Sequence, residues 1–227
     1  MQKIIIAIDG HSSCGKTTLS KELAMKLGYT YISSGAMYRA ITLYFIQHGI
    51  DINNPEAVEK ALKHITIQFD TSGQENRTLL NGTDVEDEIK EMYVSQKVSP
   101  VSAISAVRRF LVLQQRAIGA AKGIVMDGRD IGTVVFPDAE LKIFLTASVE
   151  ERVRRRFEEL KMKGIEASPE SVRENLISRD HIDSTREDSP LKKADDAIVI
   201  DNTFLTPEEQ LDKAYHLALE IIKTMDE

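Results

Sequence analysis

Short apolar runs separated by helical patterns recur along the chain. Each run is rich in Ile, Val or Leu, which is typical of strands buried on both faces of a parallel sheet. The runs are Ile4–Ile8, Ile124–Met126, Leu141–Leu145 and Ala197–Ile200, with a shorter strand expected at Tyr29–Ser33. Strands that alternate with helices predict an α/β fold, here with about five parallel strands flanked by helices.

The helical patterns between these runs have recognisable ends. The first helix is expected from about Lys16 to Leu27, with Gly28 ending it in a left-handed conformation. The last is expected from about Pro207 to Met225, and its apolar residues have the spacing of a helix packed by one face: Leu211, Ala214, Tyr215, Ala218, Leu219 and Ile222.

One segment interrupts the alternation with a β-hairpin pattern. From Ile65 to Leu80, the run ITIQF, the polar stretch TSGQEN and the run RTLLN predict two paired strands. Asn81-Gly82 supplies a further tight turn. A hairpin inserted into a parallel α/β chain is expected to form a small subdomain of its own.

A second segment, Val149 to Lys163, is helical and carries Arg152, Arg154, Arg155 and Arg156. Four glutamates on the same segment favour ion pairs on a solvated helix face. The unbroken run Arg154 to Arg156, however, covers several faces at once, as in a helical lid that brings arginines to a phosphate. A new helix starts at Ser168-Pro169-Glu170, and a polar stretch covers residues 179–186.

Composition narrows the class of protein. The chain has 227 residues, 42% hydrophobic and 29% charged, which suits one large domain or a core with small insertions. A net charge of −7 argues against coating nucleic acid or an anionic membrane, so local arginine clusters must meet any polyanion. One cysteine and an N-terminal apolar run too short for a signal peptide predict a cytoplasmic protein.

The residues Gly10 to Thr17 match the phosphate-loop pattern G-x-x-x-x-G-K-[ST], between a strand and a helix. Glycines allow backbone N–H groups to point at phosphate oxygens, and the helix adds its positive N-terminus. Lys16 is expected to reach the β/γ-phosphates, and the Thr17 hydroxyl to bind Mg²⁺. The expected ATP-binding residues are Gly10, His11, Ser12, Ser13, Cys14, Gly15, Lys16, Thr17 and Thr18. His11 and Cys14 fill variable positions, so their side chains receive no role.

Asp127 follows a buried strand and should lie at the carboxyl edge of the sheet, where α/β folds bind ligands. There it can hold Mg²⁺ through water, as in other phosphoryl-transfer sites. Asp130 lies in the turn beyond, and two interpretations stay open for it. It either stabilises the turn or contacts a ligand.

Arginines elsewhere have ordinary interpretations when taken alone. Ser33 to Arg39 reads as a helix N-cap followed by a solvated arginine. Arg108 and Arg109, near the start of a long helix, read as surface charge.

The chain resembles the bacterial cytidylate kinases, members of the nucleoside-monophosphate kinase group, from Ile4 to the last helix. The resemblance rests on SSGAMYR at 33–39, DGRDIGTVVFPDA at 127–139, KIFLTAS at 142–148 and the RD-x-x-D-x-x-R array at 179–186. The hairpin insertion is similar to the enlarged monophosphate-binding domain of the bacterial enzymes. One departure is in the phosphate loop, where Cys14 and Thr17 replace small residues of the family's pattern. Cys14 suggests a loop sensitive to oxidation or alkylation.

The resemblance implies transfer of the ATP γ-phosphate to CMP or dCMP, with Mg²⁺. Ser34, Arg39 and Arg129 would meet the monophosphate, Ser99, Arg108 and Asp130 would read the base, and Asp183 with Arg186 would bind ribose and phosphate. Charge neutralisation would fall to Lys16, Arg39, Arg129 and lid arginines such as Arg152, Arg155 and Arg179. Physical chemistry supports Asp130 as a residue that reads the base, because a carboxylate accepts from the cytosine N4 amine and is repelled by the uracil carbonyl.

The expected domains are a phosphate-loop core (1–34, 102–150 and 187–227), a monophosphate-binding region with the hairpin (35–101), and a lid with distal substrate-binding residues (151–186). The expected partners are the nucleotides ATP, CMP and dCMP, with no nucleic acid or membrane, and the chain is expected to be a monomer. Rival hypotheses are a kinase for adenylate, thymidylate or shikimate, and a nucleotide-dependent switch. The guanine-reading motif N-K-x-D is absent from the sequence.

Overall fold

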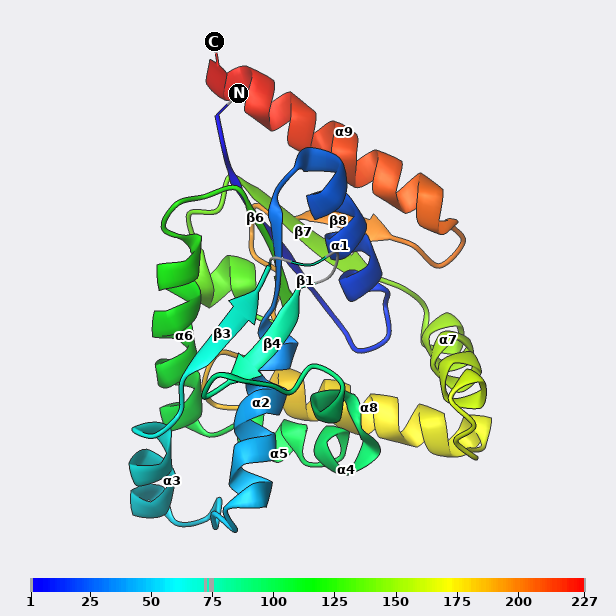
Figure 1. Cartoon of the computed structure of the whole chain (residues 1–227). Coiled ribbons are helices and arrows are strands. Elements are labelled where there is room, and N and C mark those ends of the chain that lie inside the picture. Colours follow the sequence, from blue (N-terminus) through cyan, green and yellow to red (C-terminus); the bar gives the residue numbers. More distant parts are fainter. Residues whose placement is uncertain (1, 72, 74–75, 227) are drawn as a thin grey trace. The chain divides into compact units, whose positions relative to one another are not determined.

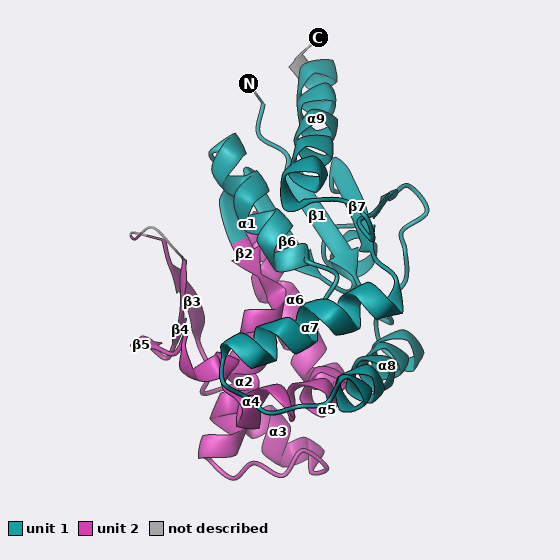
Figure 2. Ribbon diagram, turned by 90° about the vertical axis from the view of Figure 1, so that its right-hand side faces the viewer, with its two compact units in different colours: residues 1–31, 122–227 teal, residues 32–121 magenta. Residues whose placement is uncertain are grey.

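The computed structural model describes residues 2–71, 73 and 76–226. They divide into two compact units, coloured separately in Figure 2: unit 1 is Met1–Tyr31 with Lys122–Glu227, and unit 2 is Ile32–Ala121. The predicted segment 35–101 lies within unit 2 together with residues 102–121, and the predicted lid 151–186 lies within unit 1.

Five strands form one sheet, most of which is labelled in Figure 1, and its strand order is β2-β6-β1-β7-β8. Hydrogen bonds join β1 in parallel to both β6 and β7, and β7 in parallel to β8. The bounds are β1 (Ile5–Gly10), β2 (Thr30–Ser33), β6 (Ile124–Gly128), β7 (Leu141–Thr146) and β8 (Ile198–Asp201). All five predicted strands are therefore present, and the predicted α/β class is confirmed.

Two long helices cover this sheet within unit 1. Helix α1 (Lys16–Leu27) packs against β6 and against α9 (Pro207–Asp226), as Figure 1 shows. Gly28 ends α1 with φ +67°, and its N–H donates to the carbonyl of Ala24. The predicted bounds and cap of this helix are confirmed. Ile6, Leu19 and Ala218 are among the buried side chains that join sheet and helices into one core.

Unit 1 also contains a short π-helical turn and two further helices. The turn, η2 (Ile131–Val135), follows β6 directly. Helix α7 (Val149–Met162) follows β7, and α8 (Pro169–Thr185) begins at Ser168, which forms a capping box with Ser171. The polar stretch 179–186 is thus the last turns of α8 and its C-cap.

Unit 2 is built around α2 (Ser34–Gln47), which is buried on most of its faces. It contacts η1 (Glu88–Lys90), α4 (Met92–Ser95), α5 (Val98–Ser102) and α6 (Ser105–Gly119), while α3 (Pro55–Leu62) packs on α6. Apolar side chains such as Ile41, Leu43 and Leu111 form a second core there.

The predicted hairpin is present as a separate antiparallel sheet in unit 2, made of β3 (Ile67–Asp70), β4 (Arg77–Leu80) and β5 (Thr83–Asp84). Asn81 (φ +51°) and Gly82 (φ +80°) form the tight turn between β4 and β5. Two successive positive φ angles suit a twisted two-residue hairpin. Residues 72, 74 and 75 of the predicted turn TSGQEN lie outside the described residues.

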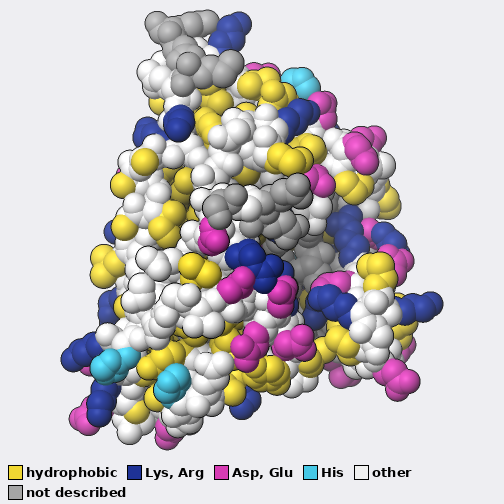
Figure 3. All heavy atoms as spheres, viewed as in Figure 1, with side chains coloured by type: hydrophobic (Ala, Val, Ile, Leu, Met, Phe, Trp, Pro, Cys, Tyr) yellow, Lys and Arg dark blue, Asp and Glu magenta, His cyan; other side chains and the backbone are white. Residues whose placement is uncertain are grey.

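Acidic and basic side chains lie interspersed on the face drawn in Figure 3. In unit 2, Arg77 donates to both Asp84 and Asp87. Within the described part of the chain, every helix is too short or too polar to cross a membrane.

Candidate active site

The phosphate loop connects β1 to α1 and depends on glycine at two positions. Gly10 has φ +152° and Gly15 has φ +89°. A Cβ atom on Gly10 would lie 2.1 Å from the backbone oxygen of Leu145. The loop therefore turns tightly over the N-terminus of α1, where backbone N–H groups and the helix dipole favour a bound phosphate.

We predict that Gly10→Ala lowers the free energy of unfolding by about 3 kcal/mol or more, because the new methyl group overlaps fixed backbone. Gly28→Ala is the matched control, since Gly28 also has positive φ but a Cβ atom on it would have nothing within 4 Å. It should cost only about 1 kcal/mol. Urea denaturation of both variants measures the difference, and equal losses would contradict the overlap.

Lys16 and Cys14 are both buried inside this loop. The Lys16 Nζ donates to the carbonyl of His11 at 2.5 Å and lies 3.6 Å from the Cys14 Sγ. Burial lowers the pKa of Lys16. Cys14 is 0% exposed. The expectation of a reactive Cys14 is therefore wrong for this conformation, because reagents need access to the thiol.

The two predicted metal ligands are neighbours. The Thr17 hydroxyl donates to Asp127 Oδ2 at 3.2 Å, and the Tyr31 hydroxyl donates to Asp127 Oδ1 at 2.7 Å. Among the described residues, no group of three His, Cys, Asp or Glu side chains forms a metal site. A hydroxyl and one carboxylate suit Mg²⁺, which keeps several water ligands.

Arg129 connects the phosphate loop to the end of α8. Its Nη2 donates to the Ser12 Oγ at 2.8 Å, and its Nε donates to Asp183 Oδ2 at 2.8 Å. Burial favours the neutral form of Asp183, but the charge and hydrogen bond of Arg129, together with the charges of Arg186 and Arg179, lower the pKa of Asp183. Arg186 Nη1 lies 3.5 Å from Asp183, and its Nη2 lies 3.8 Å from Asp130.

A second contact from α8 reaches the phosphate loop through Asp180. The Ser12 N–H donates to Asp180 Oδ1 at 3.3 Å, and Arg152 Nη1 donates to Asp180 Oδ2 at 2.5 Å. Arg152 is 5% exposed and also donates to the Ser12 carbonyl at 3.3 Å. Ser12 thus meets two arginines and one carboxylate.

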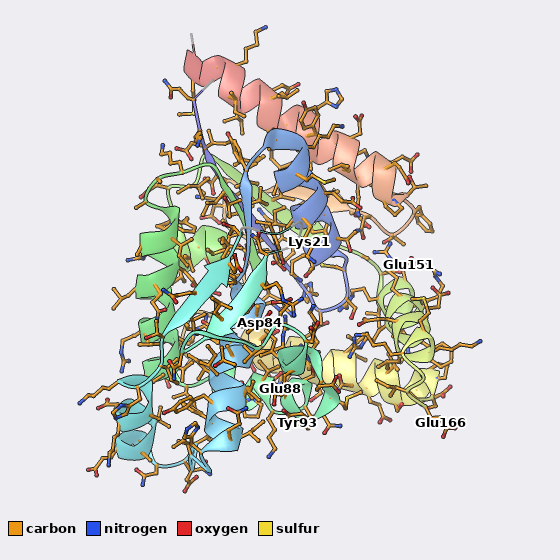
Figure 4. All side chains as sticks on the ribbon, in the orientation of Figure 1. Lys21, Asp84, Glu88, Tyr93, Glu151 and Glu166 are labelled. Carbon is orange, nitrogen blue, oxygen red and sulfur yellow. The ribbon has the colours of Figure 1, made fainter. Side chains whose placement is uncertain are left out.

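The arginines of α7 divide into two groups. Arg154 pairs with Glu151 and Glu158, and Arg156 with Glu159, so the solvated ion-pair interpretation holds for these two. Glu151, labelled on α7 in Figure 4, accepts from Arg154 and Arg155, and these hydrogen bonds lower the pKa of Glu151 to about 2.

Arg155 also contacts Asn202, which binds the phosphate loop. Its Nη1 donates to Asn202 Oδ1 at 3.1 Å. The Asn202 amide in turn donates to the Cys14 carbonyl at 2.8 Å and to Gln210 at 2.6 Å.

Two other predicted residues belong to unit 1. Thr18 lies in the first turn of α1, and the Arg179 charge contributes to lowering the pKa of Asp183.

The remaining predicted residues belong to unit 2. Ser33 caps α2 by accepting from the N–H of Ala36 at 3.2 Å, as predicted. Ser34 is buried, and Arg39 is half-buried, with its Nη1 3.4 Å from the position a Cβ would take on Gly35. Arg39 is thus only partly exposed.

Arg108 is 1% exposed, so its interpretation as surface charge is wrong, while Arg109 is exposed as expected. The Arg108 Nη1 donates to the Ser102 carbonyl at 2.9 Å, and its guanidinium lies 5.3 Å from the Tyr38 ring centroid. The Ser102 hydroxyl donates to the Ser99 carbonyl at 2.9 Å. The structure thus brings Ser99 and Arg108 to one buried cluster.

Four polar residues that contact the site carried no predicted role: Asp9, Tyr31, Asp180 and Asn202. Asp9 and Asn202 stand at the carboxyl ends of β1 and β8, the same position that identified Asp127. Applying that rule to every strand would have found them. Asp180 stands in the RD-x-x-D-x-x-R array but received no role there. Tyr31 has no such signal, because its contact depends on tertiary packing.

A parallel sheet with a phosphate loop after its first strand, and with arginines supplied by the helices beyond, defines a P-loop kinase. Residues 6–220 match the cytidylate kinase family, and the chain therefore belongs to it. A cytidylate kinase of Parabacteroides distasonis is 57% identical, covering 96% of this chain and 99% of the relative. One of Bacteroides fragilis is 57% identical, covering 92% and 94%.

Solved structures support the fold alone. The shikimate kinase of Bacteroides thetaiotaomicron superposes with a TM-score of 0.50 at 12% identity, covering 98% of this chain and 99% of that chain. Such low identity carries no information about the acceptor.

Proposed function

We propose that this chain transfers the γ-phosphate of ATP to CMP or dCMP, giving ADP and CDP or dCDP. The observation that carries the proposal is the position of Arg129, which joins Ser12 of the phosphate loop to Asp183 and directly precedes Asp130 in the chain. Residues expected to bind donor and acceptor thus meet at one guanidinium, and the relatives are named cytidylate kinases.

The chemistry needs alignment and charge neutralisation more than proton transfer. A CMP phosphate oxygen attacks the γ-phosphorus, the bond to the bridging β,γ-oxygen breaks, and ADP leaves with that electron pair. The nucleophile is already an anion, so a general base is unnecessary. We assign charge neutralisation to Lys16, Arg39, Arg129 and the lid residues Arg152, Arg155 and Arg179.

Incubation of the chain with MgATP and one acceptor at a time tests the proposal. CDP and dCDP should form from CMP and dCMP, whereas UMP, AMP, dTMP and shikimate should react far more slowly. Tight CMP binding without CDP formation would instead favour a regulatory nucleotide-binding protein. Rapid turnover of another acceptor would identify a different kinase.

Mg²⁺ fits the pair formed by Thr17 and Asp127, and we propose that these residues hold it. When bound, the ion supplies positive charge to the triphosphate. Asp127→Asn should raise the Mg²⁺ concentration for half-maximal rate by about tenfold, because an amide replaces a charged ligand. The control Asp138→Asn changes an exposed carboxylate and should leave that concentration unchanged. Equal Mg²⁺ titration curves for the wild type and Asp127→Asn would contradict the assignment.

We also propose that the chain acts as a monomer in the cytoplasm. The single cysteine of the sequence suits a reducing compartment. Size-exclusion chromatography with light scattering measures the mass, for which a monomer gives 25.4 kDa.

A further inference from the structure

A buried carboxylate outside the expected site residues lies where the phosphate loop meets the turn after β6. Asp9 is the residue before Gly10 and is 5% exposed. The register of β1 and β6 places it opposite Gly128, next to Arg129. Asp9 therefore lies at the carboxyl edge of the sheet, between the donor loop and the segment Arg129–Asp130.

Both carboxylate oxygens of Asp9 are engaged by the turn that follows this segment. The N–H of Ile131 donates to Oδ1 at 2.8 Å, and the N–H of Gly132 donates to Oδ2 at 2.7 Å. These are the first two amides of η2, which a helix cannot satisfy by itself. Asp9, on strand β1, thus caps η2, although it lies 122 residues before Ile131 in the chain.

This cap bears on the two interpretations of Asp130, as a residue that stabilises its turn or as a residue that contacts a ligand. Asp130 stands at the N-cap position of η2, but its side chain makes no capping hydrogen bond there. Its backbone carbonyl instead accepts from Val134 and Val135 at the start of the turn. Because Asp9 takes the capping role, the side chain of Asp130 does not have to fold back on its own turn, and it lies 3.8 Å from Arg186.

Burying a carboxylate at this place is unfavourable unless the donors are held in position. Burial raises the pKa of Asp9 to about 7, while the hydrogen bonds from Gly132 and Ile131 act in the opposite direction. If the two N–H groups moved away, the buried carboxylate would lose its hydrogen bonds without gaining water. That free-energy cost keeps the turn close to Asp9.

We propose that Asp9 is a positioning residue for acceptor specificity: its carboxylate fixes the Asp130–Gly132 turn, and with it the side chain that reads the acceptor base. The inference rests on the proposed function, since it assumes that Asp130 faces the base of the monophosphate. A merely structural role makes a different prediction. It would lower stability and leave the choice between acceptors unchanged.

The test compares Asp9→Asn with Glu140→Gln. Glu140 accepts from the N–H of Ile5 at 2.8 Å, at the opposite end of β1, so the control makes the same acid-to-amide change far from the ligand edge. In Asp9→Asn, an NH₂ group replaces one acceptor and faces a backbone N–H. We expect the ratio of kcat/KM for CMP to that for UMP to fall by about tenfold, mostly through a higher KM for CMP.

The same measurements include the KM for ATP and the melting temperature of each variant. The KM for ATP should change by less than the KM for CMP, and Glu140→Gln should leave the CMP/UMP ratio at its wild-type value. An unchanged ratio in Asp9→Asn, whatever its stability, overturns the inference, and so does a loss confined to ATP.

If Asp9→Asn does not fold, Gly132→Ala perturbs the same contact from the other side. A Cβ on Gly132 would lie 3.4 Å from the Asp9 Oδ2 and 3.2 Å from the Lys142 Cδ. Its CMP/UMP ratio should fall as well, and an unchanged ratio again overturns the inference. A wild-type chain that neither binds nor phosphorylates CMP would refute the proposed function itself, whereas an active wild type with an unchanged variant ratio refutes only the role of Asp9.

Discussion

Arg129→Ala is expected to lower kcat by about 100- to 1,000-fold, the range found when one donor to a developing charge is removed. The guanidinium lies between Ser12 of the phosphate loop and Asp183, 2.8 Å from each. It can therefore neutralise a phosphoryl group that passes between donor and acceptor. The buried Lys16 and the loop amides remain, so the KM for ATP should change much less than kcat.

The control for this variant is Arg154→Ala. Arg154 is exposed and pairs with Glu151 and Glu158 on α7, so its removal should leave kcat within about twofold. Arg129→Lys keeps a positive charge beside the buried Asp183 and separates loss of charge from loss of the bidentate guanidinium. Steady-state rates of all three variants, with melting temperatures, complete the test. Near-normal turnover of Arg129→Ala would refute the assignment.

The fold was predictable because its signals are local. The apolar runs predicted four of the five strands, and the short segment after the first helix predicted the fifth. Gly28 and Ser168 mark a helix end and a helix start through their own backbone and side-chain chemistry. Asn81-Gly82 predicted its turn for the same reason.

The errors concern residues whose environment comes from distant parts of the chain. Arg108 is buried because Tyr38 and Ser102, from two other helices, provide an aromatic face and a carbonyl. Cys14 is shielded inside the phosphate loop, where its thiol donates to the His11 carbonyl at 3.1 Å. The cap that Asp9 provides for η2 depends on the register of β1 against β6. A local pattern contains none of these contacts.

The second large effect is expected for Asp130→Ala, which should lower the CMP/UMP ratio of kcat/KM by about 100-fold or more. A site built to hydrogen-bond one group rejects an analogue that leaves the bond unmade, often by larger factors than an apolar pocket achieves. Asp130 is buried, so water could not offset the repulsion between its carboxylate and the uracil carbonyl. Asp138→Ala removes an exposed carboxylate eight residues further along the same segment and should not change the ratio.

Asp130→Asn distinguishes base reading from a purely electrostatic role beside Arg186. An amide carbonyl can still accept from the cytosine N4 amine, and the amide NH₂ can donate to the uracil O4, so activity with UMP should rise while activity with CMP falls moderately. If Asp130 served only as a counter-charge for Arg186, 3.8 Å away, the amide would lower kcat/KM equally for CMP and UMP. The CMP/UMP ratio would then stay constant. A gain in kcat/KM for UMP is therefore the result that a counter-charge cannot produce, and its absence in both variants would refute Asp130 as the residue that reads the base.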